Sequence, residues 1–190
     1  GINAGANISI VISAGPALLL QEFGNLCTIF LAMPVALALG LKREAIGAAH
    51  SINRETNLAL MQDMFGADSP EAQGSLSVYI VGGMVGTIYF GFMASMAAAT
   101  GLFHPYALGM ASGVGAGILM SSAVAALSEV MPAYADQIAA MASASETISG
   151  IDGIYMAIFL GIPLCNFLYR KLEPTLGRLT KTGREPAGQN

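Results

Sequence analysis

The stretch from Tyr106 to Leu127, YALGMASGVGAGILMSSAVAAL, decides the fold class of this chain. Residues without large side chains recur in it at every fourth position: Gly109, Gly113, Gly117 and Ser121. On a helix, residues four apart lie on one face, and a face of small residues lets a second helix approach closely within a membrane. We therefore expect one continuous helix over residues 106–127 that packs through its glycines.

The apolar run around this stretch indicates a membrane protein. Residues 72–128 contain no Asp, Glu, Lys or Arg, whereas a single crossing needs only about 20 apolar residues. The chain of 190 residues is 54% hydrophobic and 11% charged, and its mean hydropathy of +0.62 lies outside the usual balance of soluble domains. We expect an all-α, polytopic helical membrane protein that contacts the lipid bilayer and binds no nucleic acid.

The basic residues predict the topology. All eight Lys and Arg lie in two segments, 42–54 and 170–184, and basic segments of this kind face the cytoplasm. An even number of crossings must then separate the two segments. Four candidates lie between them: 76–100, 106–127, 133–150 and 154–169, the last two divided by a tight joint at Ile151-Asp152-Gly153.

The remaining segments complete one transmembrane domain over residues 1–174, with about five crossings in all. Gly15 and Pro16 interrupt the first apolar segment and predict a broken or re-entrant element there. Three further elements follow from hydropathy and charge: a crossing over 23–41, a cytoplasmic or interfacial helix within 44–68, and a mobile cytoplasmic tail over 175–190. Because the chain lacks an initiator Met, we expect a fragment or a processed chain, which forms a homo-oligomer or lacks an N-terminal half.

A second face of small residues lies on the crossing over 76–100, where it includes Gly82 and Gly86. The connection to the next helix is short, so the two helices are expected to be antiparallel neighbours. Their glycine faces can then meet. Helix packing is the simpler interpretation of both faces, and a functional role for the small residues stays open.

Candidate functional residues are the acids and polar residues within or beside the apolar segments. An ionisable group at membrane depth usually faces the protein interior or a water-filled cavity, and transporters place interrupted helices at their binding sites. We expect a pathway for a substrate or ion lined by Glu146, Glu22, Glu129, Asn7, Ser121 and Ser122. Glu146 lies inside an expected crossing, whereas an acid at a helix end, such as Glu22, Glu129 or Asp152, is also ordinary at a membrane interface.

Signatures of enzymes and metal sites are missing from the sequence. No H-E-x-x-H motif occurs, His50 and His104 lack metal-ligand spacing, and Cys27 and Cys165 stand alone. We expect no catalytic site, no bound metal and no cofactor.

Four motifs carry a family resemblance: Glu22-Phe23-Gly24-Asn25 through Pro34, Ala49 to Glu55, Asp68-Ser69-Pro70-Glu71, and Leu168 to Pro174. In these the chain resembles the C-terminal part of a bacterial family of uncharacterised integral membrane proteins, the domain of unknown function 3100. The resemblance implies a membrane protein but no activity. More loosely, broken apolar helices around small polar sites resemble elevator-type secondary transporters.

Two classes of function follow. We expect a multi-pass secondary transporter or transporter-like protein of the bacterial inner membrane, which moves a small polar solute or ion through a site at the helix breaks near the midplane. The alternative is a non-transporting membrane scaffold or a subunit of a larger membrane complex. A transporter needs a polar, water-accessible site at depth, whereas a scaffold is dry there.

Overall fold

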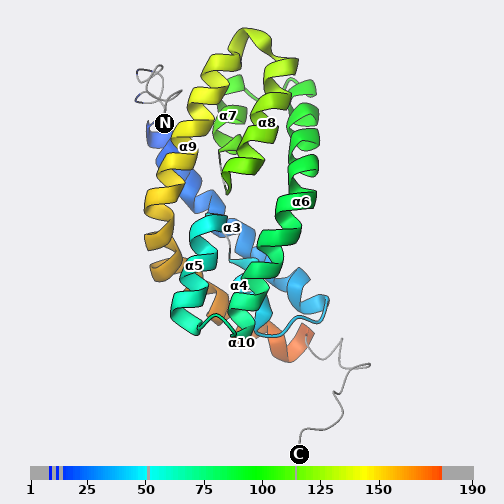
Figure 1. Cartoon of the computed structure of the whole chain (residues 1–190), viewed down its shortest axis with the longest axis vertical. Helices are drawn as coiled ribbons and strands as arrows, with labels where there is room; N and C mark the ends of the chain where they lie inside the picture. Colours follow the sequence, from blue (N-terminus) through cyan, green and yellow to red (C-terminus); the bar gives the residue numbers. More distant parts are fainter. Residues whose placement is uncertain (1–8, 10–11, 13–14, 51, 114, 177–190) are drawn as a thin grey trace, which may run out of the picture.

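A computed structural model gives the fold and describes residues 9, 12, 15–50, 52–113 and 115–176. Every regular element within these residues is a helix (Figure 1), as the all-α class predicts. Three helices are long and apolar enough to cross a membrane: Gly15–Ala38, Pro70–Ala99 and Pro132–Leu176. The structure therefore supports a helical membrane protein.

Helix α3 spans Gly15–Ala38 and contains Pro34. Gly15 and Pro16 lie where the described part of α3 starts, and the two residues before them lie outside the described residues, so the expected broken or re-entrant segment stays a prediction. Helix α3 covers most of the expected crossing over 23–41. Asn7 and most of the first 14 residues lie outside the described residues, as does all but the start of the expected tail over 175–190.

Residues 44–65 form two helices, α4 (Glu44–Ala49) and α5 (Arg54–Phe65), where the sequence predicted a single cytoplasmic or interfacial helix. Asn53 begins α5 as its N-cap, because its Oδ1 accepts a hydrogen bond from the backbone N–H of Thr56 at 3.3 Å. The residues between the helices, His50, Ile52 and Asn53, are buried. This segment folds into the bundle, where it packs against α6 and α9.

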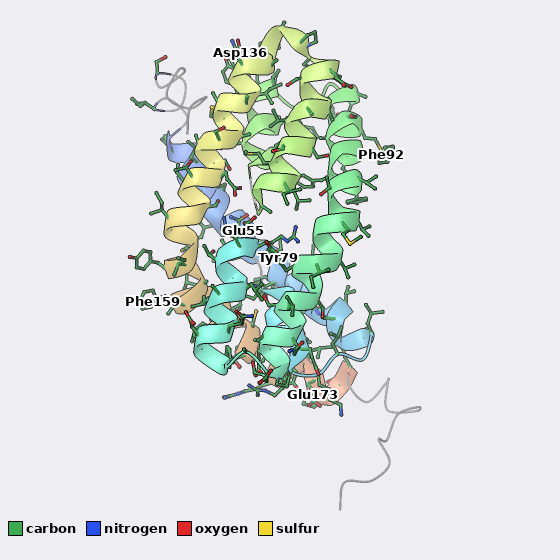
Figure 2. All side chains as sticks on the ribbon, viewed as in Figure 1. Glu55, Tyr79, Phe92, Asp136, Phe159 and Glu173 are labelled. Atoms are coloured by element: carbon green, nitrogen blue, oxygen red, sulfur yellow. The ribbon has the colours of Figure 1, made fainter. Side chains whose placement is uncertain are left out.

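Helix α6 (Pro70–Ala99) begins where local signals predict. The Ser69 hydroxyl accepts a hydrogen bond from Ala72 N–H at 3.1 Å, and Pro70 occupies the first turn. Large apolar side chains on its outer face are exposed: Val81, Met84, Val85, Ile88 and Phe92. Phe92 points away from the bundle, as does Phe159 on the opposite side (Figure 2). Such an apolar exterior is what lipid contact requires.

The decisive stretch is broken, so the prediction of one continuous helix over 106–127 is wrong. It forms α7 (Pro105–Ser112) and α8 (Gly117–Val130). Gly115 between them has a φ of 110°, which glycine adopts at little cost. Each glycine in a helix interior also costs about 1 kcal/mol relative to alanine, so a glycine-rich segment loses little when its helix is interrupted.

Helices α7 and α8 form an antiparallel hairpin. A Cβ at Gly109 would lie 2.8 Å from the Ile138 carbonyl oxygen, so α7 packs on α9. A Cβ at Gly86 would lie 3.3 Å from Leu119 Cδ2, and α8 therefore packs on α6. Figure 1 shows the hairpin between α6 and α9 in one half of the molecule, with its tip near mid-height. The two glycine faces do not meet. Gly109 packs against Ile138 of α9, whereas Gly86 packs against the Leu119 side chain of α8.

Helix α9 (Ala135–Met156) follows a short 3-10 turn (Pro132–Tyr134) and continues through a π-helical segment (Ala157–Gly161) into α10 (Ile162–Leu176). The predicted joint at Ile151-Asp152-Gly153 is therefore wrong, and the expected crossings 133–150 and 154–169 are parts of one long helix. A Cβ at Gly153 would lie 3.2 Å from Ile52 Cγ2, so this glycine serves close packing inside α9.

One end of the molecule holds an apolar core and the first residues of both basic segments. Buried side chains of α3, α4 and α10 pack there, among them Met33, Ile46 and Cys165. Arg43 Nε donates to the buried Glu71 carboxylate at 2.6 Å, and Glu173 lies at the same end (Figure 2). Both basic segments therefore begin on one side, as the even number of crossings requires.

Candidate functional site

The site is the point where two interruptions of the helices meet. The backbone N–H of Arg54, at the start of α5, donates to the carbonyl oxygen of Gly115, between α7 and α8, at 2.9 Å. The break between α4 and α5 and the break between α7 and α8 therefore both lie inside the bundle. Irregular backbone at such depth is tolerated only where it is buried in protein or lines a polar cavity.

The Arg54 side chain lies against α6. Its Nη2 donates to the carbonyl oxygen of Tyr79 and to that of Val78 at 3.4 Å, and its Cζ lies 5.4 Å from the centroid of the Tyr79 ring. A Cβ at Gly82 would lie 3.6 Å from Nη2, and one at Gly83 would lie 3.4 Å from it. Gly82, expected to serve helix packing, thus gives space to a guanidinium.

Sequence reasoning missed Arg54, because it was grouped with Lys42 and Arg43 as a cytoplasmic residue. Two features of the sequence could have identified Arg54. It lies apart from the basic pair Lys42-Arg43 along the chain, and it directly follows Ile52 and Asn53. Arg54 forms no ion pair with the part of the chain that is described, and its buried Nε has no hydrogen-bond partner there.

A buried polar chain fixes the connection between α4 and α5. Asn57 Nδ2 donates to Ser75 Oγ at 3.0 Å, and Asn57 Oδ1 lies 2.6 Å from His50 Nδ1, which must then carry the proton. His50 is fully buried. His50 Nε2 has no partner among the described residues and abuts Gly161 in the π-helical segment.

Polar side chains of α3 and α9 approach the hairpin tip. Ser145 Oγ donates to Gln21 Oε1 at 2.8 Å, and Gln21 Nε2 donates to Ser149 Oγ at 3.4 Å. A Cβ at Gly113 would lie 2.7 Å from Ser145 Cβ and would overlap the Ala142 carbonyl. The tip of the α7–α8 hairpin therefore borders this polar cluster. Gln21 was not among the predicted residues.

Of the two predicted pathway acids whose side chains are described, Glu146 and Glu129, the structure brings the carboxylate of Glu146 to this region. Its Oε2 is buried and makes no hydrogen bond with the described residues, and the charge of Glu55 acts on it. Glu55 and Tyr79 both lie near mid-height, below the hairpin tip (Figure 2). Glu55, in the first turn of α5, is a second acid that the sequence did not single out.

The other predicted residues have different environments. Glu129 is exposed near the end of α8, and Ser121 is exposed and donates to Gly117 O at 2.8 Å. Ser122 donates to Thr87 O at 2.8 Å and joins α8 to α6. A Cβ added at Gly117 would meet no described atom within 4 Å, so this glycine does not serve packing. The side chain of Glu22 lies outside the described residues, and so does Asn7.

Among the described residues, no group of three or more His, Cys, Asp or Glu side chains could hold a metal ion. The arrangement offers hydrogen-bonding groups and charges of both signs beside interrupted backbone. Such groups can bind a polar molecule without breaking its covalent bonds.

Comparison with known proteins gives one match. A family model described as "Protein of unknown function (DUF3100)" matches residues 1–171. No curated protein and no solved structure matches significantly. The comparisons therefore support the predicted family but not the looser resemblance to elevator-type transporters.

Proposed function

We propose that this chain, which belongs to the DUF3100 family, is a secondary transporter for a small polar solute in the bacterial inner membrane. The hydrogen bond from Arg54 N–H to Gly115 O carries the proposal. It joins two helical interruptions inside an apolar bundle, and unwound backbone with half-helix ends is the usual composition of a transporter binding site.

In this proposal α4–α5 and α7–α8 are re-entrant hairpins that enter from opposite faces of the membrane. Three helices cross: α3, α6 and the long helix that contains α9 and α10. Two of these crossings separate Lys42 from Arg170, an even number, so both basic ends face the cytoplasm. Three crossings and two hairpins replace the five crossings expected from hydropathy.

The polar groups at the junction favour a transporter over a scaffold. Gln21, Ser145 and Ser149 join α3 to α9 through side-chain hydrogen bonds, and Glu146 places an unbonded carboxylate oxygen beside them. A protein that only associates helices gains little from an ionisable group at this depth, where its desolvation is costly. In a transporter the same groups bind the solute or a coupling ion.

Accessibility to a charged thiol reagent tests the proposal. In a Cys27→Ser background, Ser149→Cys places a thiol at the junction, and Ala140→Cys places a matched buried thiol elsewhere on α9. Right-side-out and inverted vesicles are treated with a membrane-impermeant methanethiosulfonate. We expect modification of position 149 from at least one face and none at position 140. If both thiols are protected from both faces, the junction is dry and the scaffold alternative replaces the transporter.

A further inference from the structure

We infer that the solute is an organic anion whose carboxylate binds the Arg54 guanidinium. This inference rests on the proposed transport function and names the chemical class of its solute. The guanidinium of Arg54 carries a positive charge that has no counterion among the described residues. Among the described residues the ion pair that forms is Arg43 with Glu71, and no carboxylate of these residues lies within 4.0 Å of the Arg54 nitrogens.

The carbonyl groups around Arg54 do not neutralise its charge. The oxygens of Val78 and Tyr79 are neutral acceptors, and both belong to the continuous helix α6, which uses its carbonyls for its own hydrogen bonds. A guanidinium cannot lose its proton in a protein. Arg54 is half-buried, with its Nε fully buried, and a permanent positive charge at membrane depth is costly unless an anion or water accompanies it.

The surroundings hold the guanidinium in place and leave its Nε without an acceptor among the described residues. The Tyr79 ring and the missing side chains of Gly82 and Gly83 define its position on α6. Its Nε is buried and makes no hydrogen bond with the described residues. The planar fork of arginine matches the two oxygens of a carboxylate, so an incoming carboxylate supplies the acceptor that Nε lacks.

The nearby acids whose side chains are described do not fill this role. Glu55 follows Arg54 on α5, but its charge acts on Glu146 of α9, whereas the Arg54 side chain binds α6 on the other side. The junction is therefore divided into an acidic side and a basic side. An anion on the basic side neutralises Arg54, and a cation or proton on the acidic side reduces the negative charge of Glu55 and Glu146.

Entry of a carboxylate into the crevice requires movement of the α4–α5 hairpin. The crevice beside the guanidinium is lined by Gly47, Arg54, Asn57, Ser75, Val78 and Tyr79 and has no room for a water-sized sphere. These residues belong to α4, α5 and α6, so the crevice widens when the α4–α5 hairpin moves relative to α6. Movement of one element against another around a fixed site is how alternating access operates.

Ligand-dependent melting of the purified protein in detergent tests the inference, because a ligand that binds the folded state raises its stability. The probes are sodium acetate and sodium succinate, with succinamide, mannitol, choline chloride and sodium phosphate for comparison. We expect stabilisation of the wild type by a carboxylate and not by succinamide. Arg54→Lys keeps the charge but loses the fork, and should weaken the apparent affinity at least tenfold. Lys42→Gln, which removes a charge far from the junction, at the basic end of the molecule, should leave the response unchanged.

Each alternative result contradicts a different claim. Equal stabilisation by succinate and succinamide in the wild type, or by mannitol or choline alone, overturns the anion class while transport stands. A response to phosphate alone overturns the carboxylate. A carboxylate response that survives in Arg54→Lys removes Arg54 from the site. If no probe stabilises the wild type and the thiol at position 149 is protected from both faces, the inference and the proposed transport function fail together.

Discussion

Gly113 and Gly117 occupy equivalent positions in the sequence pattern, but the structure predicts opposite responses to the same substitution. A Cβ at position 113 would overlap the Ala142 carbonyl and lie 2.7 Å from Ser145 Cβ, whereas a Cβ at position 117 has no described atom within 4 Å. Gly113→Ala must therefore push α7 away from α9. Gly117→Ala adds a better helix former in the first turn of α8.

The magnitudes follow from packing and helix propensity. Overpacking of a tight contact costs about 1–3 kcal/mol, while replacing glycine by alanine at an unstrained helical position gains about 0.5–1 kcal/mol. For a chain of this length, 1 kcal/mol shifts Tm by about 2–4 °C. We expect Gly113→Ala to lower Tm by roughly 2–12 °C and Gly117→Ala to leave it unchanged or raise it by up to about 4 °C.

The assay is thermal melting of the two variants and the wild type in one detergent, with the fraction of monodisperse protein measured by gel filtration. Both substitutions add one methyl group to the same segment, so each is the control for the other. If the two variants melt at the same temperature, the hairpin geometry of α7 and α8 is wrong and a continuous glycine face is the better description.

Three further predictions use the same melting assay. Gly161→Ala should destabilise the protein because its Cβ would meet the His50 ring, and adding His50→Ala should recover part of the loss; equal melting of single and double variants would contradict this contact. Arg43→Gln should cost roughly 1–3 kcal/mol, because it leaves the buried Glu71 carboxylate without its charged partner. A Tm within about 1 °C of the wild type, a change of at most about 0.5 kcal/mol, would show that the pair contributes little. Glu146→Gln should keep the melting temperature but change the response to the solute, whereas an unchanged response would exclude this carboxylate from the pathway.

Local sequence determined the class of the protein and several helix ends. The uncharged run over 72–128 is sufficient for the membrane class, because solvation of an apolar surface depends on composition alone. Ser69 and Pro70 begin α6 as their capping chemistry predicts, and Gly66 ends α5 with a φ of 91°. These features depend on a few neighbouring residues, so they can be predicted without knowledge of the fold.

Only the tertiary structure decided which glycines interrupt a helix and where Arg54 lies. Gly153 was expected at a joint but lies inside α9, because Ile52 packs closely against it. Gly115 was expected inside a helix but lies at a break, where its carbonyl accepts the Arg54 N–H. In both cases the outcome depends on a partner distant in sequence. A glycine lowers the free energy of an interruption, and the contacts available in the folded bundle determine whether the interruption forms.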